Sequence, residues 1–271
     1  MDLKRLFSAL IGFPLVAIIL IFGNKYLVDI AVSIIAMMSL HEYFHSFKEK
    51  EQKQNGDLRW IAYFAALCIA FIHIIPSMYI LKIIAAIIPI SILVLFAQVI
   101  ISNMKYNIKD IAITFFGICY IVIFLMYIPI IRETANGKLT IWYVFMAAWG
   151  TDIFAYIIGK RLGKHKFSKI SPNKSIEGCI AGTIGSVLLM LIYTFVCNTY
   201  LGMNFHYGYI IIIGIVLSLV GQIGDFAASS IKRYTGIKDF SNLIPGHGGM
   251  LDRIDSVIFI APFAYFLLML I

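Results

Sequence analysis

The chain has 271 residues, of which 61% are apolar and 13% are charged, against roughly 25% charged residues in an ordinary soluble domain. This composition excludes a soluble globular enzyme, a disordered chain and a disulfide-stapled secreted module. The net charge is +8, and we interpret the excess as basic residues that flank membrane spans, where they set topology and face anionic headgroups. No nucleic-acid partner is expected.

Apolar runs broken by charges and turn residues predict nine membrane-spanning helices, since about 20 mostly apolar residues cross a bilayer. The expected spans cover residues 6–23, 26–46, 60–76, 80–103, 108–131, 139–161, 178–199, 207–233 and 256–271. The apolar stretches are continuous rather than alternating, which disfavours a β-barrel. The predicted fold is an all-α, polytopic membrane protein.

The distribution of Lys and Arg predicts the orientation of these spans. If the N-terminus is cytoplasmic, all but four of the 22 basic residues fall in cytoplasmic loops, as the positive-inside rule requires. Nine spans then leave the C-terminus outside. We therefore expect a multi-pass protein of the cell (inner) membrane, embedded in the lipid bilayer.

Acidic residues are concentrated in the second half of the chain. Residues 1–148, with about five spans, are expected to be scaffold helices. Residues 149–271, with about four spans, carry two polar segments that the charge distribution places on the cytoplasmic side. We expect this half to be catalytic, within a single integral membrane unit.

The first polar segment surrounds the end of the sixth expected span. Asp152 lies inside this apolar run, where an unpaired charge costs about 2.5–3.5 kcal/mol, so a functional role is favoured. A basic loop then leads to Ser171 and Lys174, just before the seventh span. A helix N-terminus with Ser and Lys beside it suits a phosphate group; the alternative is a solvated loop that only sets topology.

The second polar segment follows the eighth expected span. Helical spacing would place one carboxylate, one hydroxyl and two cations in a single stripe, formed by Asp225, Ser229, Lys232 and Arg233. The glycine-rich loop around Gly248 and Gly249 is able to turn backbone N–H groups toward an anion. Asp252 and Asp255 are three residues apart at the start of the last span, so both are expected on one helix face.

These residue types point to metal-assisted chemistry on phosphate. Carboxylates are hard oxygen ligands that suit Mg²⁺, and Lys and Arg neutralise phosphate charge during transfer. The residues alone therefore indicate a metal-dependent phosphate-transfer enzyme with a lipid-embedded substrate. His41 and His45 flank Glu42 at a spacing that resembles a metal pair on a helix, but a polar cytoplasmic helix end is the favoured interpretation.

The second segment resembles the signature of the phosphatidate cytidylyltransferase, or CDP-diacylglycerol synthase, family. The matching positions are Ser229, Ile231, Lys232, Arg233, Lys238, Asp239, Ser241, Ile244, Pro245, His247, Gly248, Gly249, Met250 and Asp252–Asp255. Gly224-Asp225 and elements around Asp152 and Lys174 are also similar to the family, so the resemblance is close over residues 149–260. Many members have two lysines after the Ser-Pro pair, whereas this chain has Asn173 and Lys174.

The resemblance implies a nucleotidyltransferase of phospholipid biosynthesis, which converts CTP and phosphatidic acid into CDP-diacylglycerol and pyrophosphate. It also implies Mg²⁺ as cofactor, with a second cation, monovalent or divalent, left open, and it allows a homodimer. We hypothesise that Asp225, Asp252 and Asp255 hold Mg²⁺, with Asp152 either as a further ligand or as a group that supports the ligands from behind. The groups expected to bind substrate phosphates are Lys174, Ser171, Ser229, Lys232, Arg233, Lys238, Arg253 and the His247, Gly248 and Gly249 loop.

Two other functions stay open at this point. Acids inside a membrane often mark ion pathways, which would fit a transporter or channel, although repeat symmetry is not evident in the sequence. Within the enzyme class, the runner-up is another CTP-dependent lipid enzyme, such as an archaeol cytidylyltransferase or a polyprenol kinase.

Overall fold

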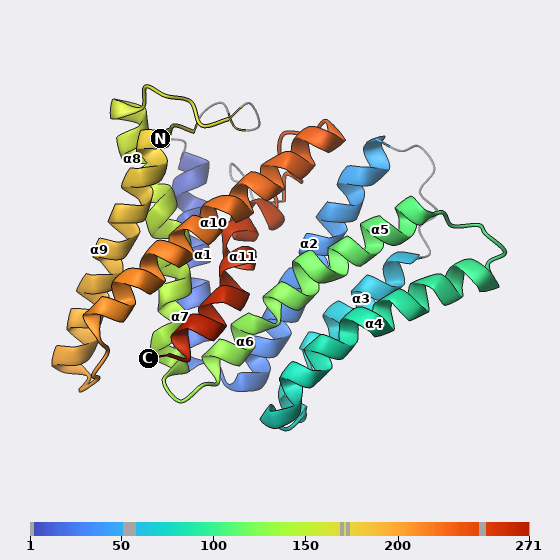
Figure 1. Cartoon of the computed structure of the whole chain (residues 1–271), viewed down its shortest axis with the longest axis horizontal. Helices are drawn as coiled ribbons and strands as arrows, with labels where there is room; N and C mark the ends of the chain where they lie inside the picture. The colour runs from blue at the N-terminus through green and yellow to red at the C-terminus, as the bar shows by residue number, and fades with distance from the viewer. Residues whose placement is uncertain (1–2, 51–57, 169–170, 172–173, 244–247, 271) are drawn as a thin grey trace. The chain divides into compact units, whose positions relative to one another are not determined.

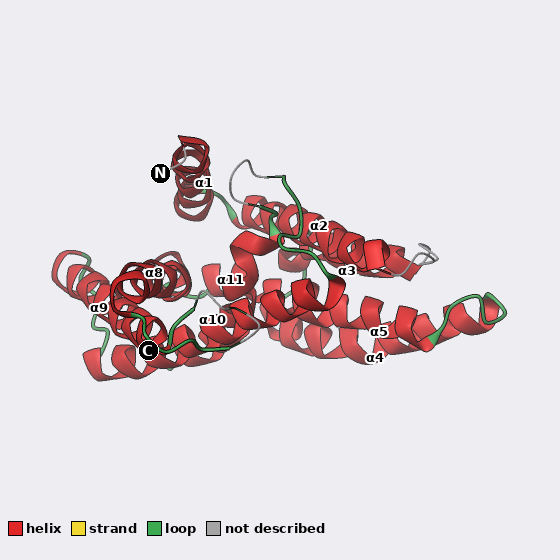
Figure 2. Cartoon of the chain, turned by 90° about the horizontal axis from the view of Figure 1, so that it is seen from above, coloured by secondary structure: helices red, strands yellow, loops and turns green. Residues whose placement is uncertain are grey.

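The computed structural model describes residues 3–50, 58–168, 171, 174–243 and 248–270. Within these residues every named element is a helix (Figure 2). Lys166 and Ser175 form an isolated antiparallel β-bridge. The predicted all-α fold is confirmed.

The helices follow one another along the chain (Figure 1), and the two longest stretches between them are residues 163–175 and 236–250. In order they are α1 (Leu3–Phe22), α2 (Lys25–Lys50), α3 (Arg59–Ile69), η2 (Ile72–Ile74), α4 (Ser77–Ile101), α5 (Ile108–Gly117), η3 (Ile118–Ile123), α6 (Tyr127–Arg132), α7 (Gly137–Phe145), η4 (Met146–Gly150), α8 (Thr151–Leu162), α9 (Ile176–Tyr200), α10 (Tyr207–Thr235) and α11 (Leu251–Leu268). Elements η3 and η4 are π-helical turns inside longer helices.

Six helical segments of the described chain are long and apolar enough to cross a membrane. They are Lys25–Phe47, Ser77–Ile101, Ile108–Arg132, Gly137–Leu162, Ile176–Tyr200 and Tyr207–Thr235. The protein therefore has the helices of a multi-pass membrane protein, and each of these six coincides with a predicted span.

The predicted span at 60–76 is interrupted in the structure. Its α-helix, α3, has 11 residues and is about 16 Å long, whereas a bilayer core is about 30 Å thick. The 3-10 turn η2 follows, and Ile75 is extended with ψ of 135°. Pro76 accounts for the extended Ile75 that ends η2, because a proline disfavours helical backbone in the residue before it.

The chain forms two compact units, each made of two stretches of sequence. The first unit comprises residues 1–129 and 235–253, and the second comprises residues 130–234 and 254–271. Helix α11 begins in the first unit and continues in the second. We expected scaffold helices up to residue 148 and a catalytic half after it. The two compact units do not test which half is catalytic, so this division stays a prediction.

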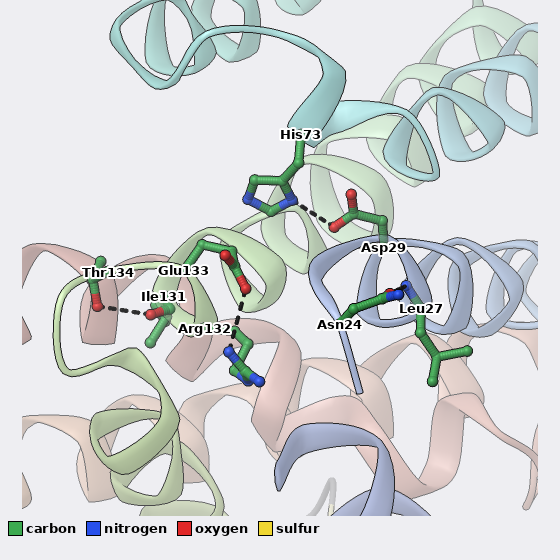
Figure 3. Close-up of polar contacts among 8 residues, drawn as sticks. All are labelled: Asn24, Leu27, Asp29, His73, Ile131, Arg132, Glu133 and Thr134. Carbon is green, nitrogen blue, oxygen red and sulfur yellow. Dashed lines mark hydrogen bonds and ion pairs between the residues drawn. The ribbon is translucent and has the colours of Figure 1, made fainter. Parts of the chain in front are cut away.

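In the first unit, α2 packs against α3 and against α5 with η3. The Tyr43 ring of α2 is buried and lies against Gly117, and its hydroxyl donates to the Ile113 carbonyl at 3.1 Å. The fully buried Asp29 carboxylate lies 2.7 Å from Nδ1 of His73 (Figure 3). This contact ties η2 to the first turns of α2.

In the second unit, α8 and α9 lie side by side along a stripe of small residues (Figure 1). A Cβ at Gly182 would lie 2.7 Å from the Thr151 carbonyl oxygen, and one at Gly178 would lie 3.1 Å from Cα of Gly159. Small residues allow such backbone approach, as they do between membrane helices generally.

The second unit also contains a buried cation near its start. Arg132 at the end of α6 is buried and contacts Glu133 at 3.2 Å (Figure 3).

Buried hydroxyl and amide groups join α10 to α8 and α9. Ser218 of α10 is 2.7 Å from the Thr151 hydroxyl and donates to the Thr183 hydroxyl at 3.1 Å, and the Gln222 amide donates to the same Thr183 oxygen at 3.0 Å. Interhelical hydrogen bonds of this kind satisfy polar groups that water does not reach. These hydrogen bonds hold α10 in place close to Asp225, which lies about one helical turn after Gln222.

Candidate active site

Between α8 and α9, hydrogen bonds join the described residues Lys174 and Ile176 to residues 165–167. The Phe167 N–H donates to the Lys174 carbonyl at 3.0 Å, and the Ile176 N–H donates to the His165 carbonyl at 2.9 Å. Ser175 caps α9, because its hydroxyl accepts from the Gly178 N–H at 3.1 Å. Lys174 thus directly precedes the cap residue of α9, so it lies beside a helix N-terminus as the sequence predicts.

The Lys174 ammonium forms an ion pair with the Asp225 carboxylate of α10. It also lies 4.7 Å from the centre of the Phe226 ring, which stacks on Phe167 at 4.6 Å. Burial lowers the pKa of Lys174, and the nearby Asp152 and Asp255 carboxylates oppose this effect. Two residues that are 51 positions apart in the sequence thus form the centre of a charged cluster.

Two further carboxylates complete the cluster in the second unit. Asp255 of α11 is buried, and this burial, reinforced by the charge of Asp152 on α8, raises the pKa of Asp255 to about 7. Lys232 of α10 and Lys174 act in the opposite direction. Gly224 allows α10 to approach, because a Cβ there would lie 2.7 Å from the Asp255 carbonyl oxygen.

The second unit therefore brings five of the predicted site residues together from α8, α10, α11 and one loop: Asp152, Lys174, Asp225, Lys232 and Asp255. Of the other predicted residues in this unit, Ser229 is buried, Ser171 is half-buried and Arg233 is exposed. Repelling carboxylates beside cations are typical of a site for a metal ion and phosphate groups.

In the first unit, the Asp252 carboxylate accepts hydrogen bonds from backbone N–H groups. Its Oδ2 accepts from the Phe240 N–H at 2.8 Å and from the Gly249 N–H at 3.0 Å. Gly248 has φ of +83°, and a Cβ there would lie 2.9 Å from the same oxygen. The Gly249 N–H, which we expected to face a phosphate, is thus directed at a carboxylate of its own chain.

Glu42 is the residue of this region that sequence reasoning missed. The polar helix end expected here is incorrect for Glu42, whose side chain is 3% exposed and accepts hydrogen bonds from Ser241, Met250 and Leu251. His41 and His45 are exposed, and their rings stack at 6.3 Å. The sequence contained one signal of this burial: Glu42 is an acid within an apolar stretch of α2, close to Ser39, Tyr43 and Phe44.

The remaining predicted residues lie elsewhere. Lys238 and Arg253 are exposed side chains of the first unit, and His247 lies outside the described residues. In the described part of the chain, no three His, Cys, Asp or Glu side chains converge as a metal site. The magnesium ligands Asp152, Asp225, Asp252 and Asp255 therefore stay a prediction.

The chain is similar to known cytidylyltransferases. A family model described as "Cytidylyltransferase family" matches residues 3–271. The phosphatidate cytidylyltransferase of Bacillus subtilis is 40% identical over 160 residues, which cover 59% of this chain and 56% of the relative. That of Staphylococcus haemolyticus is 37% identical over 176 residues, 65% of each chain.

The matched segments thus span less than two thirds of these relatives' length. The family model, in contrast, covers nearly every residue, including both polar segments and the α2 helix that carries Glu42. On that match, the chain belongs to the cytidylyltransferase family.

Proposed function

We propose that this protein is a phosphatidate cytidylyltransferase, a nucleotidyltransferase that transfers CMP from CTP to phosphatidic acid and releases pyrophosphate. The observation that carries the proposal is the Lys174–Asp225 pair, with Lys232, Asp152 and Asp255 around it. Such a cluster suits a reaction between two phosphate-bearing substrates, and relatives named for this activity share the family.

The chemistry asks mainly for charge neutralisation and alignment. An oxygen of the lipid phosphate attacks the α-phosphorus of CTP, a new P–O–P bond forms, and the bond to the pyrophosphate leaving group breaks. Because the nucleophile is already an anion, no strong general base is required. Lys174 and Lys232 would offset the repulsion between the two polyanions and hold them in line.

We propose Mg²⁺ as the cofactor, and the charges of the second unit support it. Asp255 is buried close to the like charge of Asp152, and a divalent cation would relieve that repulsion. Asp225 and Asp255 would hold the ion, with Asp152 as a further ligand or a group behind the ligands, while substrate phosphates supply the remaining oxygens. The metal role of Asp252 is proposed from the sequence alone. When bound, Mg²⁺ would neutralise charge on the phosphates; a second cation is part of the same proposal.

We also propose the full topology of nine spans, with the N-terminus in the cytoplasm, the C-terminus outside and the active site at the cytoplasmic face of the inner membrane. Support comes from the described helices that coincide with the predicted ranges and from the distribution of basic residues. Reporter fusions at the two termini would test the orientation, and cross-linking in native membranes would test the homodimer implied by the resemblance.

The activity is tested with the purified protein in detergent micelles, supplied with phosphatidic acid, CTP and Mg²⁺. We expect both pyrophosphate and a CDP-lipid, and loss of both on chelation. CDP without pyrophosphate would instead identify a lipid kinase. Absence of nucleotide turnover with phosphatidic acid and with prenyl lipids would favour a transporter.

A further inference from the structure

The α2 helix supplies a buried carboxylate to the segment that precedes α11. Oε1 of Glu42 accepts from the Ser241 hydroxyl at 2.6 Å and from the Met250 N–H at 2.9 Å, and Oε2 accepts from the Leu251 N–H at 2.8 Å. These partners are 199 to 209 positions away in the sequence. Glu42 is thus fully engaged with a distant part of the first unit.

These contacts explain how the start of α11 is stabilised. The first N–H groups of a helix have no acceptor within the helix, and the positive end of the helix dipole favours a carboxylate. Met250 and Leu251 are at this end. Glu42 therefore performs the role of an N-terminal cap from another helix.

Gly249 links this cap to Asp252. A side chain at Gly249 would overlap the Glu42 carboxylate, so glycine is required for the approach. The N–H of the same residue donates to Asp252 at 3.0 Å. Gly249 thus lies against one carboxylate and donates to another, and a shift of Glu42 would displace the backbone that orients Asp252.

We propose that Glu42 is a positioning residue, which holds segment 248–252 so that Asp252 is presented in its working orientation. The inference rests on the proposed function for the role of Asp252. In this assignment Glu42 contacts the protein's own backbone and Ser241, while Asp252 acts on the substrates or their metal ion.

The test variant is Glu42→Gln, which keeps the size of the side chain but offers an NH₂ group where one oxygen accepts a hydrogen bond. We expect kcat to fall about tenfold to a hundredfold, since misplacement by about 1 Å has effects of this size, and the Mg²⁺ concentration for half-maximal rate to rise. Ser241→Ala removes one of the three contacts and should change both quantities less, in the same direction.

The matched control is His41→Gln, because His41 is exposed on the same helix beside Glu42. It should retain the wild-type kcat and Mg²⁺ requirement. Amide hydrogen exchange provides a readout that is independent of activity: the N–H groups of Met250 and Leu251 should exchange faster in Glu42→Gln and in Ser241→Ala than in the wild type and the control.

Faster exchange together with a lower kcat would support the proposal. A wild-type kcat and Mg²⁺ requirement in Glu42→Gln would overturn the proposal. Loss of activity with unchanged amide exchange would also overturn it, because Glu42 would then act directly on the reaction. If Glu42→Gln does not fold, unchanged exchange and activity in Ser241→Ala would overturn it. Failure of the wild type to form CDP-lipid would refute the proposed function instead, while exchange would still report on the contacts.

Discussion

Carboxylates serve two different purposes in the two units. In the first unit, Glu42 and Asp252 accept hydrogen bonds from backbone N–H groups and thereby fix the fold of a loop. In the second unit, Asp225 and Asp255 face the charges of Lys174, Lys232 and Asp152. Glu42 is thus structural because its partners are backbone and hydroxyl donors, whereas Asp225 and Asp255 are suited to ligands because their partners are charged side chains. Asp252 combines backbone contacts with its proposed metal role.

The largest effect is expected for variants that remove the charge of a proposed metal ligand from either unit. Asp225→Asn and Asp252→Asn should each lower kcat by about 10²- to 10³-fold, the range seen when one electrostatic contact to the transition state is lost. Both variants should stay folded, since the amide oxygen introduced by Asp252→Asn can still accept from the N–H groups of Phe240 and Gly249. Pyrophosphate release in micelles measures the rate. Substantial activity in either variant would refute that residue's metal role.

A smaller effect is expected from the cation of the second unit. Lys174→Gln should lower kcat/KM by about tenfold to a hundredfold, equivalent to about 1.4–2.8 kcal/mol, because it removes the charge that pairs with Asp225. Lys164→Gln is the matched control, since Lys164 is an exposed lysine of the same loop. Equal losses in the two variants would show that the loop contributes only general positive charge.

The stability of the protein offers the third comparison. Asp252→Ala leaves the Phe240 and Gly249 N–H groups without this acceptor, at about 1–3 kcal/mol for each buried group, so its thermal unfolding temperature should fall. Asp225→Ala should change unfolding much less, because Asp225 is 21% exposed and bonded to a side chain. Similar unfolding temperatures for the two variants would contradict the structural role that we assign to Asp252 in addition to its metal role.

Much of the fold was predictable because membrane insertion imposes a strong pattern on sequence. Each of the six apolar helices coincides with a run of about 20 apolar residues, since a lipid environment requires both apolar side chains and internally bonded backbone. The break after α3 was not predicted, because the chain stays apolar through this break and hydropathy does not register a change of helix type.

The sequence by itself determined the helical membrane class, the two polar segments and most of the charged residues in them, since buried charges are costly and therefore conspicuous in an apolar chain. Only the tertiary structure separated their roles. The pairing of Lys174 with Asp225, and the capping of α11 by Glu42, join residues that are far apart in the chain. Hydrogen-bond partners at such separations depend on how helices pack, and local patterns do not encode that packing.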